Sequence, residues 1–147
     1  MPELPEVETV RRGLADLLPG QAVVRATVFD SPKSFPNSPT DVKQFLYGAH
    51  VTAVRRRAKV LMIDLDTRYS LVIHLKMTGQ LIFRGANSFA GGHPNDSLIG
   101  ELPDKSTRVQ IDFADGSHLF FNDQRKFGWM KLMPTDEIEN LPFMQKV

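Results

Sequence analysis

Eight short apolar runs constrain the fold of this sequence more than any other feature. Each run is rich in Val, Ile or Phe and is bounded by Gly, Asp, Pro or Asn, which is typical of strands separated by turns. Such short strands indicate an antiparallel architecture, because a parallel sheet needs a helix between successive strands. We therefore predict a mainly β fold, an antiparallel β-sandwich or barrel of about eight strands, at residues 22–29, 51–57, 60–66, 69–76, 81–84, 108–114, 117–122 and 129–133.

Two helices are expected beside the strands. Near the amino terminus, apolar residues recur at three- and four-residue steps and share one face, namely Val7, Val10, Leu14, Leu17 and Leu18. Pro5 suits an early position of this helix, and Pro19-Gly20 ends it. A second, shorter helix is predicted from Thr40 as N-cap to Gly48 as a left-handed cap.

Two segments carry no predicted helix or strand. Residues 85–106 contain four glycines and two prolines, and so long a connection in a compact domain is usually functional or mobile. The segment after Pro134 shows no clear periodicity. We therefore expect one folded domain over residues 1–133, and we interpret residues 134–147 as the start of a linker to a further domain.

The composition excludes several classes of protein. The 147 residues contain no cysteine, which rules out disulfides, thiolate zinc sites and cysteine nucleophiles and suits a reducing, cytoplasmic setting. No apolar run is long enough to cross a membrane, and the early glutamates argue against a signal peptide. The net charge is only +1, but bases cluster at residues 55–59 and 125–126, which permits a nucleic-acid groove.

The amino terminus is the first candidate for chemistry. Removal of Met1 leaves Pro2 as a free secondary amine, and an α-amine with a pKa near 7.7–8.0 is partly neutral and nucleophilic at physiological pH. Glu3 lies beside this amine as a candidate acid or base, and Glu6 falls on the same side of the first helical turn. The alternative is that Met-Pro is an ordinary start and that both glutamates only complement the helix dipole.

Three later segments also carry candidates. Lys59 follows three arginines and either contacts a phosphate or belongs to a solvated basic patch. His74 ends an apolar strand, and Met77 follows at a turn, where an exposed methionine suits a wedge in a base stack better than a core. Arg125 and Phe127 lie two residues apart and could fill the place of an extruded base; the alternative is a surface charge beside a core ring.

In this order, the four segments resemble the formamidopyrimidine-DNA glycosylase family, bacterial enzymes that remove oxidised purines such as 8-oxoguanine. The matching pieces are residues 2–10, 55–59, 74–79 and 123–128. The related endonuclease VIII branch typically has glycine where this chain has Leu4, which favours the purine-directed branch. The chain departs from the family at Ala58, where glycine is usual, and at Lys126, where arginine is common.

The resemblance implies a role for each candidate. It makes Pro2 the nucleophile at the sugar C1′ and Glu3 the group that protonates the ring oxygen. Glu6 supports the active-site network, and Lys59 contacts a phosphate and assists elimination. The implied catalytic residues are thus Pro2, Glu3, Glu6 and Lys59. The implied DNA-binding residues are His74, which contacts phosphate, and the void-filling triad Met77, Arg125 and Phe127.

The resemblance also implies a bifunctional glycosylase and abasic-site lyase, which acts through an iminium and then β- and δ-elimination. Its partner is double-stranded DNA with oxidised purines or abasic sites, and it is expected to be a monomer in the bacterial cytoplasm. No cofactor or metal is expected in this chain, because the family holds zinc on four cysteines in a C-terminal helical domain. We therefore expect these 147 residues to fold but to bind and repair DNA poorly.

Two other functions remain open at this point. One is a non-catalytic nucleic-acid-binding β-sandwich, which would be favoured if Met1 stays attached, because the Pro2 nitrogen is then an amide. The other is an unrelated β-domain that binds a small ligand or a protein. Four matching segments in order along one chain argue against the last.

Overall fold

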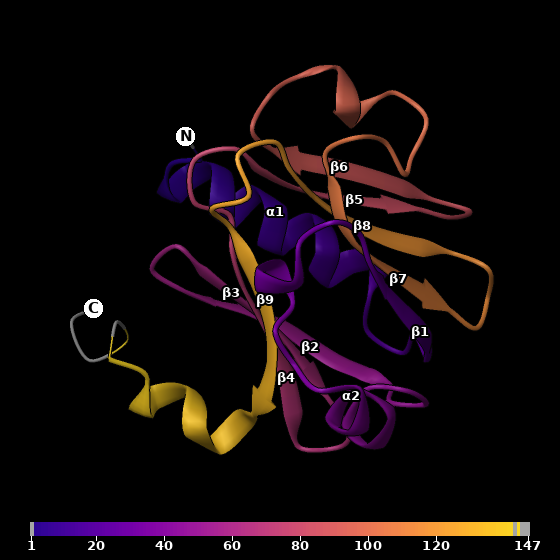
Figure 1. Ribbon diagram of the computed structural model, residues 1–147, viewed down its shortest axis with the longest axis vertical. Coiled ribbons are helices and arrows are strands. Elements are labelled where there is room, and N and C mark those ends of the chain that lie inside the picture. The colour runs from indigo at the N-terminus through magenta and orange to yellow at the C-terminus, as the bar shows by residue number, and fades with distance from the viewer. Residues whose placement is uncertain (1, 143, 145–147) are drawn as a thin grey trace.

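The computed structural model describes residues 2–142 and 144, and within them the chain forms two antiparallel sheets (Figure 1). One sheet contains β1 (Val23–Val28), β5 (Gly79–Arg84), β6 (Ser88–Gly92), β7 (Thr107–Phe113) and β8 (His118–Asp123), in the order β1-β7-β8-β5-β6. The other contains β2 (Val51–Arg57), β3 (Val60–Leu65), β4 (Tyr69–His74) and β9 (Trp129–Pro134), in the order β2-β3-β4-β9. The predicted mainly β, antiparallel fold is therefore confirmed.

The described residues also form two α-helices. The first, α1 (Leu4–Leu17), has Glu3 as its N-cap and Pro5 in its first turn, as the sequence predicts. The second, α2 (Pro39–Phe45), begins after Ser38, whose hydroxyl accepts a hydrogen bond from the Asp41 backbone N–H at 3.2 Å. The predicted N-cap at Thr40 is therefore wrong, because the serine two residues earlier caps the helix. None of these helices is long and apolar enough to span a membrane.

The first helix is fixed to both sheets. Val7, Val10 and Leu14 are buried in a core to which both sheets contribute, and α1 packs against β2 and β6. Gly13 permits the contact with β6, because a Cβ at this position would lie 2.3 Å from the Phe89 ring. The amino-terminal end of α1 is thereby held in place by the packing of the whole sandwich.

Four elements were missed by the sequence analysis. Ser88–Gly92 forms β6 inside the segment predicted to lack structure, and it pairs with β5. A strand with two glycines shows no apolar alternation, so its sequence gives little signal. After Pro134 the chain forms a 3-10 helix, η3 (Thr135–Asn140), which places Ile138 against buried Val60 and Met62 on the outer face of the four-stranded sheet. Two further 3-10 helices, η1 (Pro32–Ser34) and η2 (Asp96–Leu98), are short.

The sheet register brings the candidate segments to one end of the sandwich. Val60 pairs with His74 across β3 and β4, and His74 pairs with Trp129 across β4 and β9. This row lies at the sheet end from which the β2–β3 turn, the β4–β5 loop and the β8–β9 loop emerge. The last two loops are joined by a hydrogen bond from Thr78 to Asp123.

Candidate active site and nucleic-acid interface

The start of α1 is connected to the β2–β3 turn. The Glu6 carboxylate accepts a hydrogen bond from the Glu3 backbone N–H at 3.1 Å, and the two residues form a capping box. The other carboxylate, on exposed Glu3, lies 3.3 Å from Lys59 Nζ. Pro2 is buried just before the helix. Glu3 therefore contacts both Glu6 and Lys59, and Pro2 is its neighbour in the chain.

The arginines before Lys59 are paired with acids instead of facing a ligand. The ion pairs are Arg55–Asp64, Arg56–Glu8 and Arg57–Glu139. The pair with Glu8 joins β2 to α1 at 2.9 Å, and hydrogen bonds from Arg11 and then Arg56 hold the pKa of Glu8 well below its usual range. The basic run is therefore mainly a set of structural contacts, and Lys59 is the member that reaches the candidate site.

A basic cavity lies beside Lys59. It has a volume of about 460 Å³ and is lined by Ala58, Lys59, Val60, His74, Lys76, Trp129 and Lys131. Three lysines on one cavity attract anions, and lysine is a common ligand of phosphate. The chemistry of this lining suits a phosphate group better than a neutral or cationic ligand.

His74 is held as a neutral ring in this cavity. The Lys76 backbone N–H donates to His74 Nδ1 at 3.0 Å, which leaves Nε2 as the ring's own donor. Burial, followed by the positive charges of Lys76 and Lys59, lowers the pKa of His74 to about 4. Near neutral pH, His74 therefore offers a hydrogen bond and no charge to a bound phosphate.

The lowered pKa predicts a pH dependence of stability. A folded-state pKa of about 4, below the ordinary 6.5, means that the unfolded chain binds a proton first as the pH falls. The contribution of the neutral His74 ring to the free energy of unfolding is complete above about pH 6.5, and it is lost as the pH falls toward 4. The ring is half-buried, so solvent screening reduces the effect. We expect the free energy of unfolding of wild type to fall by about 1 kcal/mol more than that of His74→Gln between pH 7 and 5. Urea denaturation at both pH values measures this, and equal losses would contradict it.

The backbone conformation of Ala58 shows why glycine is usual at this position in the family that the chain resembles. It lies in the β2–β3 turn with φ 51°, in the left-handed region that favours glycine. An L-residue in this region carries a cost of about 1–2 kcal/mol, part of which is offset by the lower chain entropy of alanine. The turn that presents Lys59 is therefore formed under backbone strain.

Replacing Ala58 should relieve this strain. We expect Ala58→Gly to raise the free energy of unfolding by about 0.5–1 kcal/mol, because glycine adopts positive φ freely. The matched control is Ala53→Gly in β2, where φ is not positive and glycine should lower stability by a similar amount. Chemical denaturation compares the two variants. A loss of stability in Ala58→Gly would show that the turn is not strained.

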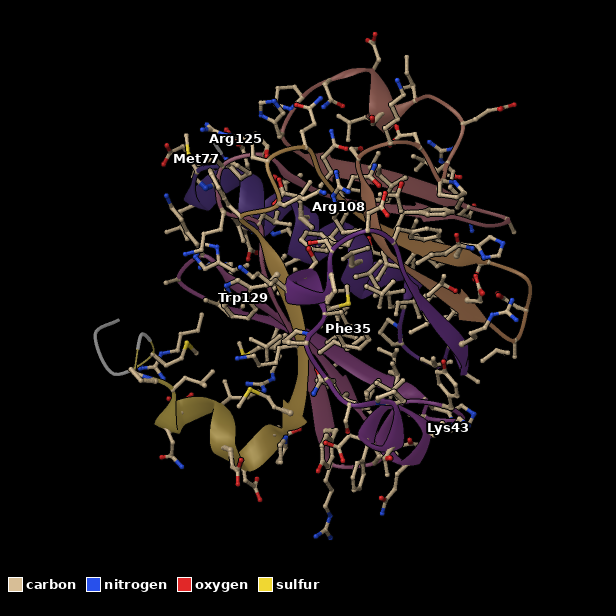
Figure 2. All side chains as sticks on the ribbon, viewed as in Figure 1. Phe35, Lys43, Met77, Arg108, Arg125 and Trp129 are labelled. Atoms are coloured by element: carbon tan, nitrogen blue, oxygen red, sulfur yellow. The ribbon has the colours of Figure 1, made fainter. Side chains whose placement is uncertain are left out.

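The three void-filling candidates lie together on the neighbouring loops. Met77 and Phe127 are 41% and 54% exposed, which confirms the prediction of an exposed methionine at this turn and shows that Phe127 is not a core residue. Arg125 contacts both, with Nη1 3.7 Å from Met77 Sδ and its guanidinium carbon 5.0 Å from the Phe127 ring centre. Figure 2 shows Met77 and Arg125 side by side at the edge of the molecule. An exposed apolar pair around a guanidinium is suited to base stacks.

A second cavity connects this cluster to the first. It has a volume of about 820 Å³, and it shares Lys76 and Trp129 with the His74 cavity. The rest of its lining is Ser31, Lys33, Met77, Arg125, Lys126, Phe127 and Gly128. The two cavities thus adjoin at Lys76 and Trp129, and we refer to the pair as the cleft. Lys59, which contacts Glu3, lines one cavity, and the Met77 cluster lines the other.

Several lining residues were not found by sequence analysis. They are Lys33, Lys76, Trp129 and Lys131, which come from η1, the β4–β5 loop and β9. Isolated charges at distant positions form no motif. The pairing of β4 with β9 brings Lys76, Trp129 and Lys131 together, and the contact of η1 with β9 adds Lys33. Lys131 lies 5.7 Å from the Trp129 ring centre, so charge and aromatic surface alternate along the cleft.

The described residues contain no cluster of side chains typical of a metal site. The sequence contains no cysteine, and residues 2–142 and 144 include no group of three His, Asp or Glu side chains placed to hold a metal ion. The site described above is built from amine, carboxylate, imidazole and guanidinium groups.

Comparison with known proteins identifies the family. The family model "Formamidopyrimidine-DNA glycosylase N-terminal domain" matches residues 1–130. The chain belongs to the formamidopyrimidine-DNA glycosylase family. The family member from Jannaschia sp. (strain CCS1) is 44% identical over 137 residues, which are 92% of this chain and 46% of the relative. That from Chloroflexus aurantiacus is 38% identical over 90% of this chain and 43% of its own length. The chain spans about half the length of the curated relatives it matches.

Solved structures agree with this assignment. A complex of the wild-type Lactococcus lactis enzyme with DNA containing N7-benzyl-Fapy-dG has a TM-score of 0.76 and 30% identity, over 99% of this chain and 48% of that one. A complex of the same enzyme with DNA containing an abasic site has a TM-score of 0.75 and 30% identity, over 98% and 47%. The predicted resemblance to formamidopyrimidine-DNA glycosylases is therefore confirmed for the sequence and the fold.

Proposed function

We propose that this chain carries the catalytic half of a DNA glycosylase and abasic-site lyase that removes oxidised purines from double-stranded DNA. The observation that carries the proposal is the pair of adjoining basic cavities, one lined by Lys59, which contacts Glu3, and the other by the exposed Met77, Arg125 and Phe127 cluster. Its relatives are glycosylases of this name, and solved complexes of a relative contain damaged or abasic DNA.

The proposed reaction begins at Pro2 after removal of Met1. The lone pair of the secondary amine attacks C1′, and the bond from C1′ to the damaged base breaks with its electron pair leaving on the base. Glu3 gives a proton to the ring oxygen, so that the sugar opens and an iminium forms between Pro2 and C1′. The Pro2 nitrogen loses its one proton to solvent as the iminium forms, and the departing base takes up a proton from solvent.

Elimination follows from the iminium, which accepts electrons. Loss of a proton from C2′ expels the 3′ phosphate in the β step, and loss of a second proton expels the 5′ phosphate in the δ step. Lys59, 3.3 Å from Glu3, lies where it can hold a phosphate or move these protons. His74 supplies a neutral donor to the neighbouring phosphate. Water finally releases the sugar fragment from Pro2.

The exposed cluster serves the other requirement of the reaction, access to the base. A base inside a duplex must be extruded before C1′ can be attacked, and the gap must be filled. Met77 and Phe127 can enter the stack while Arg125 pairs with the base left opposite, because all three project from adjoining loops. We propose lysines 33, 76, 126 and 131 of the cleft as further contacts to the DNA backbone.

The test is borohydride trapping on duplex DNA with 8-oxoguanine or an abasic site. Borohydride reduces an iminium to a stable amine, so a covalent protein–DNA adduct reports the intermediate. The chain should be used with Met1 removed, at low ionic strength and high concentration, because it spans about half of its relatives and phosphate contacts supply much of the affinity. An adduct supports the proposal. Binding without any adduct supports the non-catalytic nucleic-acid-binding module instead.

A further inference from the structure

We propose that Asp123 is a positioning residue, whose buried carboxylate holds the Met77 and Arg125–Phe127 loops in the arrangement needed to enter a base stack. This inference rests on the proposed function. Asp123 ends β8, and its side chain is 0% exposed, although it is a carboxylate. A buried carboxylate is costly unless it is fully hydrogen-bonded, so its partners indicate its role.

The carboxylate receives hydrogen bonds from both loops. Oδ1 accepts from the Thr78 hydroxyl of the β4–β5 loop and from the Arg125 backbone N–H at 3.2 Å. Oδ2 accepts from the Gly128 backbone N–H at 2.5 Å. Thr78 Oγ1 also accepts from the Arg125 N–H at 3.3 Å, which closes the network. No ion pair to this carboxylate is found among the described residues.

Each exposed side chain is at or beside one of these anchors. Met77 precedes Thr78, Arg125 is itself anchored through its N–H, and Phe127 precedes Gly128. An acceptor-only group is required, because all three partners donate hydrogens. Thr78 and Asp123 are 45 residues apart in sequence. One carboxylate therefore fixes the spacing between two loops that are distant along the chain.

Asp123 is itself held rigidly by its backbone. Its N–H donates to the Ser106 carbonyl at 2.8 Å, and its carbonyl accepts from Arg108 Nε at 2.8 Å. Arg108 is buried as well. Figure 2 shows Arg108 in the body of the molecule, away from the exposed pair of Met77 and Arg125. The two loops are thus anchored through Asp123 to the interior of the five-stranded sheet.

The first experiment uses the free protein. Thr78→Val removes the hydroxyl but keeps the shape, and Thr78→Ser is the matched control that keeps the hydroxyl. We expect Thr78→Val to speed amide hydrogen exchange at Arg125 and Gly128 by about tenfold and to raise the mobility of the ¹³C-labelled Met77 methyl group. Thr78→Ser should change neither. Asp123→Asn, which puts an N–H₂ where an acceptor is needed, should act like Thr78→Val.

The second experiment measures preference for damage, as the ratio of affinities for a duplex with a stable abasic-site analogue and for an undamaged duplex. Thr78→Val and Met77→Ala should each lower this ratio by about tenfold, and the double variant should be no worse than either, because both changes act on one wedge. Affinity for undamaged DNA should fall less than affinity for the abasic duplex, and Thr78→Val should lower the Tm by a few degrees because a buried carboxylate loses one partner. A merely structural role would lower the Tm without changing the ratio.

The outcomes separate the inference from the proposed function. Unchanged exchange and methyl mobility in Thr78→Val, or equal effects of Thr78→Val and Thr78→Ser, would overturn the positioning role. Losses that multiply in the double variant would overturn it too. If wild type shows no preference for the abasic duplex, the proposed function fails, and the exchange experiment still decides whether Asp123 positions the loops.

Discussion

A chain in which the Pro2 nitrogen is held in an amide is expected to give no borohydride-trapped adduct at all. Adding a single N-acetylated glycine before Pro2 produces such a chain, because an amide nitrogen has no available lone pair and the acetyl group leaves no new α-amine. The Pro2 nitrogen lies just before α1 and next to Glu3. The packing of α1 against both sheets fixes the position of this end of the helix. Gel analysis of the adduct on abasic DNA measures the effect, with the chain that begins at Pro2 as reference.

The matched control decides which amine reacts. Lys59 is the other amine next to Glu3, with its Nζ 3.3 Å from the carboxylate. An ammonium in an ion pair lacks a free lone pair, so we expect Lys59→Ala to keep an adduct and mainly to slow the strand cleavage that follows. If the glycine-extended chain still forms adduct while Lys59→Ala does not, then Lys59 is the nucleophile and the proposed mechanism is wrong.

Gly128→Ala is expected to lower the free energy of unfolding by about 2–3 kcal/mol, which corresponds to a fall in Tm of roughly 10 °C. A Cβ at this position would lie 2.8 Å from the His74 carbonyl oxygen, 2.9 Å from Asp123 Oδ2 and 3.0 Å from the Phe121 ring. Backbone and fully buried atoms cannot move away easily. The new methyl group would therefore force β9 away from β4 at the row that carries His74 and Trp129.

Thermal unfolding followed by circular dichroism measures this effect. Gly100→Ala is the control, because a Cβ at residue 100 has the Asp96 carbonyl as its only neighbour within 4 Å, at 3.3 Å. We expect this control to unfold within a few degrees of wild type. Equal Tm values for Gly128→Ala and wild type would show that the loop relaxes without cost and that the close packing around Asp123 is not essential to the fold.

Local patterns in the sequence were sufficient for most of the fold. The three- and four-residue spacing of Val7, Val10 and Leu14 predicts α1 correctly, and the apolar runs predict all strands except β6. Those signals work because each element buries one face of its own residues. The glycine-rich β6 is held by pairing with β5 and by contact with α1, which a local pattern does not contain.

The candidate site was only partly predictable for a similar reason. Met77 could be proposed because an apolar side chain at a turn is unusual, and Phe127 because it lies two residues from Arg125. The structure shows both exposed. The pairing of Arg56 with Glu8 could not be predicted, because 48 residues separate the two and either side chain could have faced solvent. Asp123 was part of a matching segment, but its contacts with Thr78 depend on two loops that meet only in the folded chain.

The anchoring of both loops to one buried carboxylate has a consequence for the nucleic acid. Side chains mounted on so stiff a support cannot reshape themselves around a base pair, so the deformation during insertion must occur in the duplex. Steps that unstack easily, such as pyrimidine–purine steps, should then be entered faster than rigid A-tracts. The flexibility of the surrounding sequence, and not only the chemistry of the damaged base, would therefore influence how quickly a lesion is found.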